Sequence, residues 1–93
     1  MSCKYDDWNF RLNLYKLAIF AGKEKDIKGI KNSYPEILNK MTSDEAASVM
    51  DFCLNHPLAH KRLSCQLLAF GAVGYFLNDE KFAQYQKTIV RAL

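Results

Sequence analysis

The sequence has little of what marks β-structure, a membrane protein or a secreted protein. None of its four glycines follows asparagine or aspartate, so the commonest signal of a tight β-hairpin is absent. The longest apolar run, Leu67 to Leu77, has 11 residues, whereas a helix that spans a bilayer needs about 20. The first ten residues contain no apolar core, which argues against a secretory signal. These absences favour a helical protein that does not span a membrane.

The cysteines also do not fit a disulfide framework. Cys3, Cys53 and Cys65 are an odd number, and no two of them form a CxxC pair. A secreted framework normally pairs all of its cysteines, and this set leaves at least one without a partner. The cysteine content therefore predicts a reducing, cytoplasmic environment.

Length, composition and charge are those of one globular domain. The chain has 93 residues, 49% of them hydrophobic and 25% charged, which supports a single core over residues 1–93. The first few residues are a candidate for disorder. The net charge of +3 favours acidic partners only mildly, and it is too small to indicate nucleic acid by itself.

Apolar residues recur with helical spacing along almost the whole chain, so the predicted fold is all-α. Five to six short helices, of an irregular helix-hairpin type, are expected to form a compact bundle around a central apolar helix at 58–77. The first two helices resemble, in their rhythm, a hairpin of repeat proteins such as ankyrin or HEAT, although no second copy follows at a fixed period. The predicted helices cover residues 7–21, 23–33, 35–40, 43–55, 58–77 and 78–92.

Several residues are placed to begin or end these helices. Gly22 stands where a helix end requires a left-handed residue. Thr42 and Glu45 have the spacing of a capping box, and so do Ser33 and Glu36. Each of these pairs is therefore expected to begin a helix.

The second half of the central helix is apolar all round, as expected of a helix covered by its neighbours. Gly71 and Gly74 lie within it, and glycine in a helix interior is unfavourable in isolation. We expect both glycines to allow a neighbouring helix to pack closely on the backbone.

The densest group of reactive side chains is Cys53, His56, His60 and Cys65, all within 13 residues. Cysteine and histidine are the usual ligands of tetrahedral zinc, and the two histidines are four positions apart. However, Pro57 places a helix boundary between the histidines, and both cysteines fall on core-facing stripes, where a free thiol behaves as a small apolar group. Core packing is the favoured interpretation, and no cofactor is predicted.

A catalytic cysteine would need an exposed thiol, an imidazole within reach and a group that orients the imidazole. Cys65 and His60 fall on different sides of a helix, and no carboxylate is placed to orient His56 beside Cys53. The sequence therefore favours a protein without enzymatic activity.

Aromatic and acidic side chains gather near the start of the chain. Rigid aromatic side chains are typical anchors of protein–protein interfaces, so this cluster is a candidate partner-binding patch. The alternative is that Trp8 closes one end of the bundle, and the sequence supports both interpretations about equally. The cluster consists of Tyr5, Trp8 and Phe10 beside Asp6 and Asp7, and the partner-binding candidates are Tyr5, Asp6, Asp7 and Trp8.

Two short basic segments are further candidates for partner binding. The first, 23–31, includes Lys28 and Lys31, together with two acidic residues that halve its charge. The second stands in the first turns of the central helix, where positive charge is unfavourable for the helix dipole. It consists of His60, Lys61 and Arg62.

The leading hypothesis is a small non-catalytic module that binds another protein. Among such proteins, a bacterial inhibitor of the immunity type, which neutralises a toxin by direct binding, fits the size, the lack of catalytic groups and the predicted location. The alternative is a nucleic-acid-associated regulator that uses the segments 23–31 and 60–62. A zinc or thiol protein is the third hypothesis.

Overall fold

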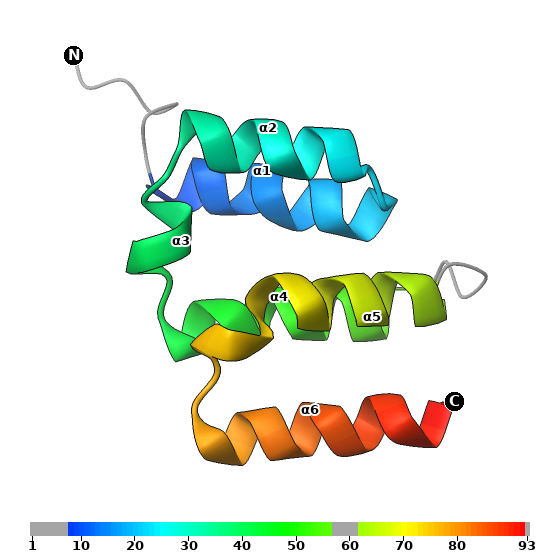
Figure 1. Cartoon of the computed structure of the whole chain (residues 1–93). Helices are drawn as coiled ribbons and strands as arrows, with labels where there is room; N and C mark the ends of the chain where they lie inside the picture. The colour runs from blue at the N-terminus through cyan, green and yellow to red at the C-terminus, as the bar shows by residue number, and fades with distance from the viewer. Residues whose placement is uncertain (1–7, 57–61, 93) are drawn as a thin grey trace.

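Residues 8–56 and 62–92 are described by the computed structural model, and within them the chain is all-α, as predicted (Figure 1). These residues form six α-helices and one turn of 3-10 helix, with no strand. None of the helices in these two ranges is long and apolar enough to cross a membrane. The elements are α1 (Trp8–Ala21), α2 (Glu24–Ser33), α3 (Ile37–Lys40), α4 (Ser43–Asn55), α5 (Arg62–Val73), η3 (Gly74–Phe76) and α6 (Asp79–Ala92).

The helices form two antiparallel hairpins and a final single helix, stacked in chain order (Figure 1). α1 and α2 make the first hairpin, α4 and α5 make the second, and the short helix α3 connects the two. Because α5 packs on α1, α4 and α6, it lies at the centre of the stack. The predicted arrangement of helix hairpins around a central apolar helix is therefore confirmed.

Local signals set several helix ends. Gly22 has a φ of 69°, and the backbone N–H groups of Gly22 and the next residue donate to carbonyls in the last turn of α1, which forms a Schellman motif. The predicted capping box begins α4: the Thr42 hydroxyl accepts from the Glu45 N–H at 3.2 Å, and the Glu45 carboxylate accepts from the Thr42 N–H at 2.9 Å. Asn78 caps α6 through its side-chain oxygen.

The second predicted capping box, Ser33 with Glu36, is not formed. Ser33 is the last residue of α2, and α3 begins only at Ile37 without a side-chain cap from Glu36. The Glu36 carboxylate instead pairs with the guanidinium of Arg11 on α1. A contact between helices has therefore replaced the local one that the spacing predicted.

The central helix ends earlier than predicted. Its described part, α5, ends at Val73 and passes into η3, and Leu77 already has an extended backbone with φ −71° and ψ 143°. The expected start at residue 58 lies in the segment 57–61, outside the described residues.

The role predicted for Gly71 and Gly74 was wrong. A Cβ on Gly71 would meet nothing within 4 Å, and the three atoms nearest to one on Gly74, from 3.5 Å, belong to the ring of Phe70 in the last turn of α5. Among the described residues no neighbouring helix therefore packs on Gly71, and the atoms nearest to Gly74 belong to the turn before it. One side of α5 is open instead, and Leu67 on that side is 46% exposed.

The hydrophobic core lies between the hairpins and takes side chains from every helix of the stack. α1 and α4 supply most of its fully buried residues, α3 supplies one, and Val73 ends α5 inside it. The largest fully buried side chains are Tyr15, Ile19, Ile37, Val49, Met50, Cys53 and Val73.

Candidate functional site

Cys53 of α4 and Cys65 of α5 lie together inside the second hairpin. They are 1% and 3% exposed, and their thiols lie close enough for each to shift the pKa of the other. The structure thus places both thiols in the core, where the apolar stripes of the sequence had put them. That the two thiols meet was not evident from the sequence.

His56 is oriented by aromatic packing. It is the C-cap residue that follows α4, and its ring centroid lies 4.1 Å from that of Phe20 and 5.4 Å from that of Phe52. His60, the other histidine of the predicted cluster, lies outside the described residues. Across 8–56 and 62–92, no three Cys, His, Asp or Glu side chains are placed to share a metal ion.

Burial raises the pKa of both core thiols, and the neighbouring thiol of Cys65 raises that of Cys53 further. Because the thiolate is the reactive form, such thiols react slowly near neutral pH. We expect iodoacetamide to alkylate Cys53 and Cys65 at least about tenfold more slowly in the native protein than in guanidinium chloride. Mass spectrometry assigns the modified positions, and rapid native alkylation of either residue would contradict this expectation.

Trp8 begins α1 and is half-buried near the start of α4. Its indole N–H donates to the carboxylate of Glu45, the same side chain that completes the α4 capping box, and the Lys40 ammonium lies 5.4 Å from a Trp8 ring centroid. These contacts favour the interpretation that Trp8 closes the bundle. The other members of the predicted patch, Tyr5, Asp6 and Asp7, lie outside the described residues.

A polar contact between α4 and α6 was missed by sequence reasoning. The Tyr85 hydroxyl donates to Asp51 Oδ1 at 2.6 Å, beside a hollow that is also lined by Gln66 of α5. Burial raises the pKa of Tyr85, and the charge of Asp51 raises it further, so the phenol stays protonated and holds α6 on α4. The one signal in the sequence was the position of Gln66 directly before the apolar run Leu67 to Leu77, and the structure buries this polar side chain.

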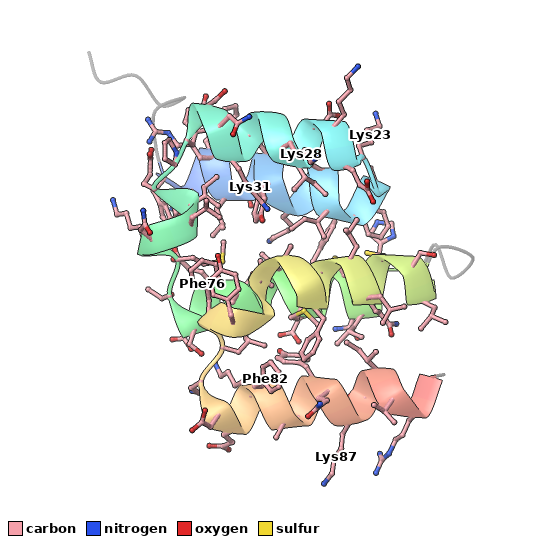
Figure 2. All side chains as sticks on the ribbon, in the orientation of Figure 1. Lys23, Lys28, Lys31, Phe76, Phe82 and Lys87 are labelled. Carbon is pink, nitrogen blue, oxygen red and sulfur yellow. The ribbon has the colours of Figure 1, made fainter. Side chains whose placement is uncertain are left out.

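Apolar hollows lie on both sides of α2. Ile27 is the one buried residue of α2. Four lysines, one directly before α2 and three within it, line the two hollows. We call this surface the α2 ridge. Its lysines are Lys23, Lys25, Lys28 and Lys31, three of them labelled in Figure 2.

The larger hollow lies between α1 and α2 and has a volume of about 640 Å³. Its floor includes Leu14, Leu17 and Ile30, and Leu17 is 54% exposed. Gly29 also lines the hollow, and a Cβ placed there would meet nothing within 4 Å. The hollow is therefore open over an apolar floor.

The smaller hollow, of about 260 Å³, lies between α2 and α5. Leu67 and Gly71 of α5 line it together with Lys28 and Lys31 of α2, and the two lysines are labelled in Figure 2. The structure thus brings the two predicted lysines together with the open side of α5. The second basic segment cannot be placed beside them, because His60, Lys61 and the side chain of Arg62 lie outside the described residues.

The α2 ridge carries an excess of positive charge. Its four lysines face two acidic residues, Glu24 and Asp26, and none of these six side chains forms an ion pair within the described part of the chain. Lysines and apolar side chains line the same two hollows. The α2 ridge is therefore suited to a ligand that offers both apolar and acidic groups.

These features define a small all-α protein of stacked helix hairpins with a basic, apolar-flanked surface. In comparisons with known proteins, no protein-family model, no curated protein and no solved structure matched the chain. Its function is therefore inferred from its own residues.

Proposed function

We propose that this chain is a small non-catalytic protein that binds another protein through the α2 ridge and its two hollows. The main support is the exposure of Leu17 and Leu67 on either side of a basic helix. Single exposed leucines are ordinary, but leucines that line hollows beside unpaired lysines are typical of binding surfaces. Leucine side chains there would supply apolar contact, and the lysines would orient the partner.

Within this class, we propose a cytoplasmic inhibitor of the bacterial immunity type, which neutralises a toxin by direct binding. The lysines of the α2 ridge then require that the neutralised protein present an acidic surface. This requirement excludes the common arrangement in which an acidic inhibitor covers a basic nuclease.

A double substitution tests the proposal. The variant Leu17→Glu with Leu67→Glu should lose the partner that the native protein retains from a lysate of its source or from the product of a neighbouring gene. We expect the dissociation constant of the recovered partner to rise at least about a hundredfold, because each glutamate would place a charge in an apolar contact. Affinity purification followed by calorimetry measures this change.

Leu38→Glu is the matched control, since Leu38 is 38% exposed on α3 and lines neither hollow. It should bind the partner as the native chain does. The proposal fails if the native protein retains no partner, or if the double variant binds with unchanged affinity while its circular dichroism shows an intact fold.

The four unpaired lysines of the α2 ridge also support the alternative of a nucleic-acid-associated regulator. Against it, Lys23 and Lys25 line one hollow while Lys28 and Lys31 line the other, so the charges do not form one continuous stripe. A steep fall of affinity for DNA or RNA with rising salt would favour this alternative, and absence of binding at low salt would remove it.

A further inference from the structure

We infer that the hollow between α1 and α2 receives an acidic amphipathic helix of the partner protein. The inference rests on the proposed function and names the chemistry of the partner. Three features of the molecule support it: the position of the hollow, the way α6 covers the second hairpin, and the charge around α2.

The part of the hollow formed by Leu14 and Leu17 lies on the side of α1 that faces away from the core. Leu12 and Ile19 are buried toward the second hairpin, and Leu14 and Leu17 fall on the other side of the same helix because each residue turns the helix by about 100°. Two antiparallel helices with small or apolar residues along their seam form a trough that matches the face of a third helix. The open space above Gly29 allows that helix to approach closely.

The molecule already contains one such helix. α6 lies on the second hairpin, opposite the first, and buries Tyr85 and Ile89 from one of its faces (Figure 1). Polar contacts fix its position: the Lys81 ammonium lies 2.6 Å from Asp44 Oδ1, and Tyr85 donates to Asp51. Within the described residues no helix covers the outer face of the first hairpin, which has an equivalent apolar trough.

The lysines beside the hollow favour an acidic helix of the partner over a basic one. Lys23 and Lys25 stand at the hollow against the single carboxylate of Asp26, and Lys28 and Lys31 line the hollow on the other side of α2. A helix with leucines or other large apolar residues at i, i+3 or i+4 and i+7 would fill the trough. Glutamate or aspartate beside those positions would pair with the lysines, whereas a basic helix would be repelled.

A displayed library of helical peptides, randomised in both its apolar and its charged positions, is the probe. Selection on the full-length protein should enrich peptides with the apolar spacing described above and a net negative charge. Leu17→Glu should weaken the selected peptides at least about tenfold, and Leu67→Glu should change their affinity by less than about twofold. Fluorescence anisotropy of labelled peptides measures both effects.

Charge reversal provides the second arm of the experiment. In the variant Lys23→Glu with Lys25→Glu, the acidic peptides should bind at least about tenfold more weakly, and a new selection should favour basic peptides. Lys87→Glu is the control, because Lys87 is exposed on α6 at the other end of the stack (Figure 2). Lys87→Glu should bind the acidic peptides selected on the native protein with unchanged affinity.

The inference is overturned if the selected peptides show no acidic preference, if they respond to Leu67 rather than Leu17, or if no peptide is selected. None of these outcomes removes the proposed function, which fails on a separate result, namely unchanged capture of the partner by the Leu17 and Leu67 double variant.

Discussion

Replacing Tyr15 with phenylalanine should raise the free energy of unfolding by about 1–3 kcal/mol. Tyr15 is fully buried, and its hydroxyl has no hydrogen-bond partner within the described residues. Phenylalanine keeps the ring in place and removes a polar group that lost its hydration on folding. Urea unfolding of the two proteins measures the difference.

Tyr85→Phe is the matched control with the opposite sign. The Tyr85 hydroxyl donates to Asp51, so its loss should lower the free energy of unfolding by about 1 kcal/mol. If Tyr15→Phe is destabilising as well, the Tyr15 hydroxyl must have a partner such as a buried water molecule.

The Tyr15 hydroxyl should also change how the free energy of unfolding depends on pH in the alkaline range. Burial raises its pKa from 10.0 to about 12, and the nearby Tyr75 contributes in the same direction. Since the folded-state pKa exceeds the unfolded one, ionisation of Tyr15 does not affect the free energy of unfolding below pH 10, and it lowers that free energy as the pH rises to about 12. The stability advantage of Tyr15→Phe should therefore widen by about 2–3 kcal/mol over that range. Unfolding midpoints of the native protein and of Tyr15→Phe, measured over this pH range at constant ionic strength, give the difference.

The ends of a helix could be predicted from the sequence where residues within one turn of each other determine them. Thr42 and Glu45 form their capping box within one turn, and Gly22 needs only its own left-handed backbone, so the predicted ends agree with α4 and α1. Ser33 and Glu36 have the same spacing as a capping box, but Glu36 pairs with Arg11, 25 positions away. No local pattern contains that competing contact.

The candidate site depended on contacts that hydrophobic pattern does not specify. Leu17 and Leu67 belong to apolar stripes, and apolarity alone predicts burial, yet a helix face is buried only where another element covers it. Likewise, the sequence placed Cys53 and Cys65 on core-facing stripes, but their contact requires the register of α4 against α5. The open side of α5 and the hollow beside α1 therefore appeared only in the folded chain.

Replacing Ile37 with alanine should lower the free energy of unfolding by about 3 kcal/mol, whereas Leu38→Ala, one position later, should cost about 0.5 kcal/mol or less. Ile37 is fully buried and Leu38 is 38% exposed, so the pair compares the same loss of side-chain volume inside and outside the core. Chemical denaturation of both variants and the native chain measures the difference. Equal costs would contradict the placement of α3.

The number of unfolding transitions of Ile37→Ala also tests whether the two hairpins unfold together. α3 has only four residues and cannot be stable by itself, so Ile37 is the core side chain through which it is held between the hairpins. Since α1 also packs directly on α4 and α5, the variant should still unfold in one transition, with coincident circular dichroism and fluorescence midpoints. Two separate transitions would show that α3 supplies the coupling between the hairpins, and the hollow between α2 and α5 would then depend on Ile37 for its shape.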